Sequence, residues 1–327
     1  MSARRIRTAW AAALLATTGA LLAACAAATP PVVEIERENP PRGKFVQVEG
    51  LRVHYVAMGP EDGPGAVLIH GATGNLNDMT FDLAPRLAER GMRVIAFDRP
   101  GLGYTERPAS EGWKPAVQAR ILRAAAERLG LERPVVAGHS WGAAVALAWA
   151  AAAPEATAGA VVISGATMPW REGGDTTFTP IVTSRPAAAL GSALLQAFTL
   201  RDGGRGAAER IFRPQSPPEG YLDHLQAELI LRTESFRANT EDIQKLNGAL
   251  TEQAKAYPTL DVPVRILHGR ADETTPPAVH AVRLAEMLPR AELSLFEGVG
   301  HMLHHARPKA VSDAVEALAA STAEEQG

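Results

Sequence analysis

The sequence of 327 residues is poor in cysteine and has no basic run in its main body. Its one cysteine, Cys25, excludes an intramolecular disulfide framework and a metal site built on several thiolates. The net charge of −3 and the absence of a basic run argue against nucleic acid as a partner. No internal repeat divides the chain. Its apolar share of 46 % is sufficient for the core of one large domain or two small ones.

The N-terminal residues differ in composition from the rest. Three arginines within the first seven residues precede an apolar run, which is the pattern of a secretory signal peptide over residues 1–24. The run is close to the lower length limit of a membrane span, so an uncleaved anchor is the alternative. Residues 22–25, LAAC, resemble the lipobox of bacterial lipoproteins. This resemblance implies a lipid on Cys25 and an exported protein anchored in the cell envelope, in the periplasm or on the outer surface.

Residues 25–42 hold two proline pairs, Pro30-Pro31 and Pro40-Pro41. Proline lacks a backbone N–H and fixes its own φ, so the segment is unsuited to a helix or a central strand. We therefore expect a lipidated linker between the membrane and the folded part of the protein.

From residue 43 onward, strand and helix patterns alternate. KFVQVEG and LRVHYVAMG predict an antiparallel hairpin with Gly50 at its turn. The short apolar runs GAVLIHG, RVIAFDRPG, RPVVAGH and GAVVISGA are typical of buried strands, and helical patterns separate them. This alternation predicts an α/β fold with a mostly parallel central sheet and helices on both faces.

The alternation stops between residues 166 and 257, where the apolar spacing is helical and no strand is predicted. VPVRILHG and AELSLFEG then restore it. We predict a core formed by residues 43–165 and 258–322, with residues 166–257 inserted as a helical cap. The apolar cap residues could line a substrate pocket or simply pack the cap onto the core; they are Met168, Trp170, Phe178, Leu190, Leu194 and Phe198.

Residues 135–144, VVAGHSWGAA, place a serine between two glycines at the junction of an apolar strand and a helix. In this context G-x-S-x-G is typical of a nucleophile elbow, where the serine occupies a strained turn. Gly138 and Gly142 provide room that a side chain would fill. The N-terminus of the next helix would stabilise negative charge that develops near Ser140.

The elbow and three further segments resemble the α/β-hydrolase superfamily over nearly all of residues 45–320. LIHGATGN is similar to the family's oxyanion loop, which implies that the backbone N–H groups of Ala72 and Trp141 bind an oxyanion. HGRADETTPP and GVGHMLHHARP follow the last two strands, where the family keeps its acid and its base. The resemblance thus assigns Asp272 and His301 to these roles. DRPGLGYTERP matches a turn that is usually structural.

The mechanism that the resemblance implies needs no cofactor. Ser140 would attack a carbonyl carbon, His301 would accept its proton, and Asp272 would orient His301. Water would then hydrolyse the acyl-enzyme. Asp272 could instead only cap a helix, and Glu273 and Asp261 are competing acids, although Asp261 lies before the strand.

Three histidines crowd the last loop. His304 and His305, together with His301, could suggest a metal site, but no other part of the chain has ligand spacing, and we predict none. We expect His304 and His305 at the surface or at a helix start. The other histidines that we place are expected to be structural: His54, His70 and His139.

Trp141 is the one feature that suggests another reaction. Haloalkane dehalogenases and epoxide hydrolases often carry tryptophan after a nucleophilic aspartate, which forms an ester that water can open. Ser140 would form an ether that water does not readily open, so the sequence favours carbonyl substrates, and we expect the indole to line the pocket. We predict an esterase- or lipase-like serine hydrolase with a small acyl substrate. Alternatives are carbon–carbon or aminoacyl (proline iminopeptidase-like) hydrolysis, perhydrolase or haloperoxidase chemistry, and a non-catalytic binding lipoprotein.

Overall fold

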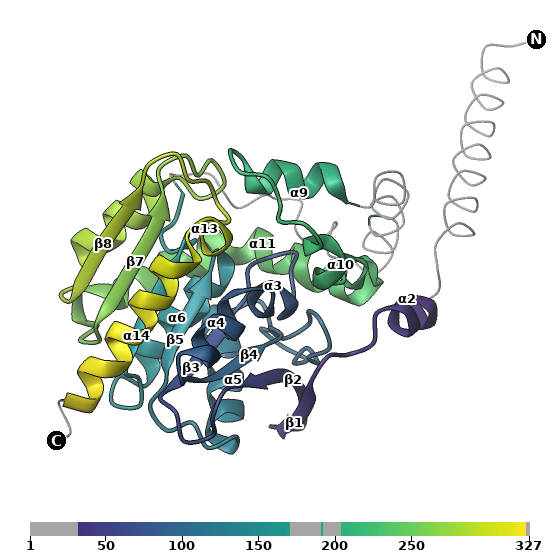
Figure 1. Ribbon diagram of the computed structural model, residues 1–327, viewed down its shortest axis with the longest axis horizontal. Coiled ribbons are helices and arrows are strands. Elements are labelled where there is room, and N and C mark those ends of the chain that lie inside the picture. The colour runs from purple at the N-terminus through teal and green to yellow at the C-terminus, as the bar shows by residue number, and fades with distance from the viewer. Residues whose placement is uncertain (1–31, 171–190, 192–203, 325–327) are drawn as a thin grey trace, which may run out of the picture.

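An eight-stranded sheet organises the chain in the computed structural model, which describes residues 32–170, 191 and 204–324 (Figure 1). The strand order is β1-β2-β4-β3-β5-β6-β7-β8. The strands are β1 (Lys44–Val48), β2 (Leu51–Met58), β3 (Gly65–Ile69), β4 (Arg93–Phe97), β5 (Val135–His139), β6 (Gly159–Ile163), β7 (Val264–Gly269) and β8 (Ala291–Phe296). β2 runs antiparallel to both β1 and β4, and all other neighbours are parallel. The predicted α/β-hydrolase fold is confirmed.

The burial of the strand residues depends on the position of each strand in the sheet. Every residue of β5 and β6 is buried, because helices cover both faces of the centre of the sheet. The edge strand β8 has no buried residue. At the other edge, the β1–β2 hairpin turns at Glu49 and Gly50, which both have positive φ (53° and 77°). This is the backbone of a tight two-residue hairpin turn, and it explains the glycine that the sequence places there.

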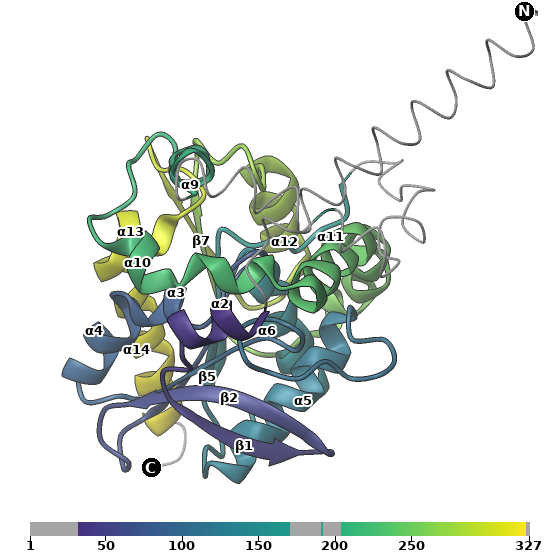
Figure 2. The same ribbon diagram turned by 90° about the vertical axis from the view of Figure 1, so that its right-hand side faces the viewer.

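Helices pack on both faces of the sheet (Figures 1 and 2). On one face, α4 and α14 share an apolar cluster with β5 and β6. On the other face, α5 and α6 pack against β1, β3, β5 and β6, and α12 lies beside them. These core helices and the short turns beside them are α3 (Asn77–Thr80), α4 (Leu83–Glu89), α5 (Pro115–Arg128), α6 (Trp141–Ala152), η3 (Ala278–Val282), α12 (Arg283–Met287), α13 (Leu303–Ala306) and α14 (Pro308–Glu324).

Between β6 and β7 the described residues contain helices and no strand, as predicted. They are α9 (Arg205–Phe212), α10 (Tyr221–Leu225), η1 (Ala227–Leu231), α11 (Thr233–Gln253) and η2 (Ala254–Thr259). Figure 1 draws α9, α10 and α11 together at one end of the sheet. Asn239 of α11 bonds to Thr73, just after β3, so this is the carboxyl end of the parallel strands.

Two of the apolar residues predicted in the cap can be placed. Met168 is buried in the cluster that contains α12. Trp170 packs partly against the core, with its ring edge-on to His280 at 4.4 Å. Both therefore pack onto the core. Phe178, Leu190, Leu194 and Phe198 lie outside the residues whose side chains are described.

The segment before the sheet contains a helix, α2 (Val32–Glu38), where the sequence predicts only an extended linker. The two proline pairs flank this helix, and proline costs little just before a helix begins or just after it ends. The contacts that stabilise α2 come from residues far away in the sequence. Ile35 is buried against η1, and Glu36 pairs with Arg232. The expectation of a poor helix is therefore wrong for residues 32–38.

Across residues 32–170, 191 and 204–324, no helix combines the length and the hydropathy needed to cross a membrane. The predicted signal peptide over residues 1–24 and its Cys25 lie outside the described residues.

Candidate active site

Ser140 lies between β5 and α6 with φ 52° and ψ −118°, a backbone conformation that side-chain-bearing residues rarely adopt. Its N–H donates to Ile163 (3.0 Å), and its carbonyl accepts from Ala166 (3.0 Å). A Cβ on Gly138 would lie 2.2 Å from the Gly142 carbonyl oxygen, and one on Gly142 would lie 2.4 Å from the Ile69 carbonyl oxygen. Two glycines are therefore needed for this turn.

His301 and Asp272 meet although 29 residues separate them. Asp272 follows β7 and His301 follows β8, and parallel pairing of these strands brings the two loops to one edge. His301 Nδ1 lies 2.9 Å from Asp272 Oδ2. Asp272 Oδ1 accepts the N–H groups of Thr274 (2.9 Å) and Thr275 (3.0 Å). Oδ1 thus caps the local turn, while Oδ2 contacts His301. Asp272 therefore acts as a cap and as the partner of His301 at the same time.

The competing acids do not reach this position. Glu273 is exposed, and Asp261 is exposed with an ion pair to Arg290 (3.7 Å). Asp272 is buried, and burial alone would raise its pKa. Hydrogen bonds from His268 and His301 outweigh this effect and hold the pKa of the Asp272 carboxyl well below its usual range. The carboxyl is therefore ionised at neutral pH.

His268, at the end of β7, was not singled out in the sequence. Its Nε2 lies 3.1 Å from Asp272 Oδ2 and 2.7 Å from the Thr275 carbonyl oxygen. It thus contacts the same carboxylate oxygen as His301 and also a carbonyl of the local turn. A histidine four residues before the acid, at a strand's carboxyl end, is the signal that could have indicated it.

Ser140 and His301 lie on adjoining loops. In the described part of the chain, no hydrogen bond joins the Ser140 hydroxyl to the His301 ring. His139 connects the two loops instead, since its Nε2 lies 3.1 Å from the His301 carbonyl oxygen. Burial, followed by the charges of His304 and His301, lowers the pKa of His139 far below its usual value, so its ring is a neutral structural donor. Hydrogen bonds between catalytic groups are often long in the absence of substrate and shorten when substrate binds, so a catalytic pairing of Ser140 with His301 does not require this bond in the free protein.

The loop after β3 passes directly against the elbow. A Cβ on Gly71 would lie 3.1 Å from Ser140 Cβ, and Ala72 follows immediately. Trp141 is the first residue of α6, a position whose N–H has no intrahelical acceptor. Two backbone positions predicted to bind an oxyanion therefore lie on segments adjacent to Ser140.

The cap helix α11 holds this loop. Thr73, a β-branched residue, has a strained φ of 60°. Asn239 Oδ1 accepts the Thr73 N–H (2.7 Å), and Asn239 Nδ2 donates to Thr73 Oγ1 (3.2 Å). One buried amide side chain thus fixes the conformation of the residue beside Ala72. No sequence pattern indicates this contact, because Asn239 lies 166 residues from Thr73.

The Trp141 side chain does not line a pocket, contrary to expectation. It is 1 % exposed, the Arg99 guanidinium lies 4.1 Å from its ring, and its Nε1 donates to the Asp242 carbonyl (3.2 Å). Arg99 also pairs with the Asp242 carboxylate at 2.8 Å, and both side chains are fully buried. The indole therefore connects the elbow to α11. Its contact with Arg99 also helps to stabilise the buried Arg99–Asp242 ion pair, because charges removed from water require favourable contacts to offset the cost of desolvation.

His304 and His305 follow Leu303 at the start of α13, but their side chains are only 1 % and 3 % exposed and do not lie at the surface. Both Nε2 atoms face Asp78, at 3.2 Å and 2.9 Å, and the Tyr221 hydroxyl donates to the same carboxylate (2.8 Å). Asp78 thus gives this cluster a third group of the kind that ligates metals. In the described residues neither Nδ1 atom has a partner, so metal at Nε2 would leave two buried N–H donors unpaired. Hydrogen bonds from the two imidazoles to Asp78 therefore explain the arrangement of His304 and His305 better than a bound metal ion would.

His54 and His70 make hydrogen bonds of a structural kind, as expected. His70 Nε2 accepts the Arg99 N–H (3.0 Å), and its Nδ1 lies 2.8 Å from the Gly71 carbonyl oxygen. His54 Nδ1 lies 2.6 Å from Asp98, whose carboxylate also accepts the N–H of Leu76. The Asp98 turn is therefore a scaffold for the loop beside Ser140.

Buried histidines should make the fold sensitive to mild acid. Burial, followed by the charge of Arg99, lowers the pKa of His70 to about 4, and burial followed by His268 lowers that of His280 to about 4. Between about pH 6.5 and 4 the unfolded chain binds protons that the native state does not, so stability falls as the pH falls. Each such group contributes a slope of up to about 1.4 kcal/mol per pH unit. Urea unfolding at pH 7.5, 6 and 5 should show this loss, and equal unfolding free energies would contradict it.

The chain matches the model of the alpha/beta hydrolase fold family over residues 67–308. It is 28 % identical over 277 residues to a 2-hydroxy-6-oxononadienedioate/2-hydroxy-6-oxononatrienedioate hydrolase of Paraburkholderia phymatum, covering 79 % of this chain and 88 % of that protein. It is 30 % identical over 275 residues to a non-heme chloroperoxidase of Streptomyces lividans, covering 83 % and 96 %. The enol-lactonase of Burkholderia xenovorans LB400 has a similar fold (TM-score 0.66, 19 % identity, 84 % and 99 % covered). The chain belongs to the alpha/beta hydrolase family and is an enzyme.

Proposed function

We propose that the protein is a serine hydrolase that cleaves a carboxylic ester or a related acyl bond through Ser140, His301 and Asp272. The buried pair formed by His301 and the ionised Asp272, on the loop adjoining a strained serine elbow, is the observation that supports this proposal most strongly. A binding protein would have no need of an oriented imidazole beside a strained serine.

The mechanism begins when His301 Nε2 accepts the Ser140 hydroxyl proton as the oxygen attacks the substrate carbonyl carbon. Asp272 accepts the Nδ1–H of His301, fixes its tautomer and stabilises the imidazolium that forms. The N–H groups of Ala72 and Trp141 stabilise the tetrahedral oxyanion. His301 then protonates the leaving group. A water molecule next attacks the acyl-enzyme while His301 accepts its proton, and His301 finally returns a proton to Ser140 as the acid product leaves.

Hydrolysis of a carbon–carbon bond is a second candidate, and the name of the relative from Paraburkholderia phymatum favours it. A panel should compare p-nitrophenyl esters of rising chain length, lactones, aminoacyl amides and a 2-hydroxy-6-oxo-dienoate. The ester proposal predicts the highest kcat/KM on an ester or lactone with an uncharged, small or medium acyl group. Preference for the dienoate would replace it with carbon–carbon hydrolysis, and preference for charged acyl groups would contradict the expected uncharged acyl group. Because one relative is named a non-heme chloroperoxidase, the panel should also include an assay for peracids.

Replacing Asn239 by alanine should slow the reaction through the oxyanion loop. Thr73 would lose both hydrogen bonds that hold its strained backbone, so the Ala72 N–H would be displaced. A shift of about 1 Å costs on the order of 100-fold in rate, and we expect kcat to fall by 10- to 100-fold with little change in KM. Aspartate at 239 keeps the acceptor and should restore part of the rate. Asn247→Ala, about two turns further along α11, is the matched control, and an equal loss there would contradict the positioning role.

We further propose that the protein is exported and anchored by a lipid on Cys25. The LAAC sequence at the end of the apolar run supports this proposal. Metabolic labelling with a palmitate analogue should mark the wild type and leave Cys25→Ser unmarked. Equal labelling of the two would contradict lipidation, and a retained signal sequence in the mature protein would favour an uncleaved anchor.

A further inference from the structure

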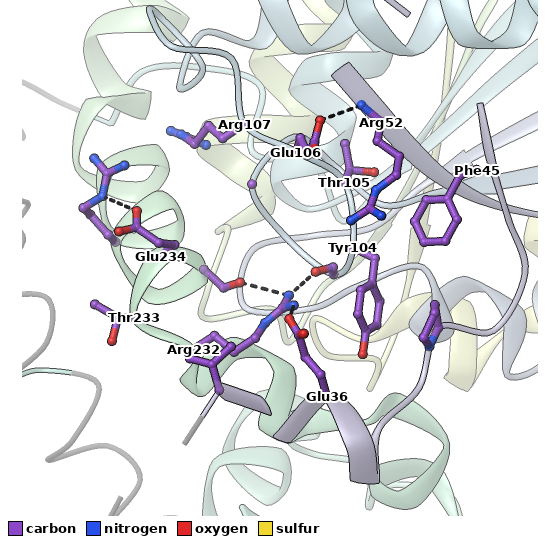
Figure 3. Close-up of a pocket in the computed structure, with 16 residues that line it drawn as sticks. Glu36, Phe45, Arg52, Tyr104, Thr105, Glu106, Arg107, Arg232, Thr233 and Glu234 are labelled. Atoms are coloured by element: carbon purple, nitrogen blue, oxygen red, sulfur yellow. Dashed lines mark hydrogen bonds and ion pairs between the residues drawn. The ribbon is translucent and has the colours of Figure 1, made fainter. Parts of the chain in front are cut away.

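A cavity of about 560 Å³ lies apart from the candidate catalytic residues. Its walls come from α2, the β1–β2 hairpin, the loop over residues 101–107 and the first turns of α11 (Figure 3). Ser140, Asp272 and His301 contribute nothing to these walls. The cavity is therefore separate from the candidate active site and lies beside residue 32, where the described part of the chain begins.

The cavity opens beside an exposed apolar surface. Val32 and Phe45 line it and are 45 % and 37 % exposed, and the neighbouring Val33 is 77 % exposed. Among the described residues, these are three of the four large apolar side chains that are exposed. Tyr104 adds a second aromatic ring to the wall. Such an exposed apolar surface is suited to contact with an apolar partner rather than with water.

Most charges in the cavity wall are already neutralised. Three of its arginines have carboxylate partners; the pairs are Arg232–Glu36 (2.8 Å), Arg107–Asp242 (2.8 Å) and Arg237–Glu234 (3.0 Å). Glu106 is a wall carboxylate that no ion pair neutralises among the described residues; it accepts the backbone N–H of Arg52 (2.8 Å).

Arg52 is the exception among the arginines of the wall. Its guanidinium lies over the Phe45 ring, 4.7 Å from the ring centroid, and pairs with no carboxylate in the described part of the chain. Figure 3 shows it pointing into the cavity between Phe45 and Tyr104. A guanidinium held on an aromatic ring keeps its forked donors available for a phosphate or carboxylate. The cavity therefore combines one available cation with an apolar rim, which is complementary to an anionic amphiphile.

We propose that this cavity binds the anionic head group of a bilayer lipid. Arg52 holds the phosphate, while Phe45 and Val32 contact the adjoining apolar carbons. The proposal uses the membrane attachment proposed above: residue 32 follows Cys25 by seven residues, a reach of at most about 25 Å. Anionic lipids attract basic side chains held this close to the bilayer. Head-group binding would fix the orientation of the domain on the membrane, with α2 toward the lipid.

The test is native mass spectrometry of the detergent-purified full chain carrying Ser140→Ala, which prevents turnover of the probe. Dioctanoyl phosphatidylglycerol should bind about tenfold more tightly than dioctanoyl phosphatidylcholine. Adding Arg52→Gln should remove this preference, and Arg52→Lys should keep part of it. Arg128→Gln, an equal charge change at the exposed end of α5, should have no effect.

Unchanged binding in Arg52→Gln, or equal binding of the two lipids to the parent protein, would overturn the proposal. Octanoate binding as tightly as phosphatidylglycerol would replace the lipid head group with a free fatty acid. Arg52→Gln in the otherwise wild-type chain should hydrolyse a soluble ester within about twofold of the wild-type rate. Because lipid binding is measured without turnover, a protein that binds lipid but hydrolyses no ester would refute the proposed hydrolysis alone.

Discussion

Ser140→Ala is expected to lower kcat for ester hydrolysis by about 10⁵- to 10⁶-fold, because without the hydroxyl no acyl-enzyme forms. The fold should survive, since alanine keeps the same backbone and Cβ in the strained turn and loses only one oxygen. The residual rate over water would come from the oxyanion donors and from substrate binding. The measurement is kcat for the best ester of the substrate panel, with thermal unfolding of the same sample as a check on the fold.

Ser312→Ala is a control for the loss of one buried hydroxyl, because Ser312 lies on α14 and bonds only to backbone carbonyls there. It should leave kcat unchanged. A Ser140→Ala enzyme that keeps more than about a tenth of the wild-type kcat would contradict a nucleophilic role for Ser140.

Asp272→Asn is expected to lower kcat by about 10⁴-fold with a much smaller change in KM. Asparagine keeps the size of the side chain and can still accept the N–H groups of Thr274 and Thr275, so the local turn should persist. The side of the amide that faces His301 can become a donor, which favours the tautomer of His301 that cannot accept the proton of Ser140.

Glu273→Gln makes the same chemical change at the next residue, which is exposed. The account predicts a rate near that of the wild type. An effect of Glu273→Gln equal to that of Asp272→Asn, or an Asp272→Asn enzyme with an unchanged rate, would show that the acid of the site had been assigned wrongly.

The fold was predictable because local patterns determine it. Strand and helix alternation, the Gly50 turn and the fully apolar central strands each follow from neighbouring residues. The meeting of Asp272 and His301 was also accessible, because both follow strands that had been predicted and parallel neighbours end at the same edge of a sheet. The remaining step was to recognise the order of acid and base along the chain.

Other features depend on partners far away in sequence, and patterns do not reveal these. Helix α2 forms because η1 covers Ile35, about 190 residues further along the chain. His305 is buried because Asp78, 227 residues away, accepts its Nε2–H. The Trp141 side chain is buried because Arg99 of a buried ion pair and the backbone of α11 contact it. Each of these outcomes was decided by tertiary contact rather than by local sequence.

These distant contacts share a functional consequence. Asn239 holds the loop before the elbow, and Trp141 contacts α11 at Asp242, one helical turn from Asn239. The cap helix is thus tied to both backbone segments that are proposed to bind the oxyanion. Changes in the cap should therefore alter the rate of the chemical step as well as the choice of substrate.

Labelling with a fluorophosphonate tests the central claim most directly, since this reagent phosphonylates a serine that is activated by its base. The full-length protein should incorporate one phosphonate, and peptide mass spectrometry should locate it on Ser140. The labelling should disappear in Ser140→Ala and become much slower in Asp272→Asn. A folded wild-type protein that remains unlabelled, or a label on another residue that persists in Ser140→Ala, would contradict the account.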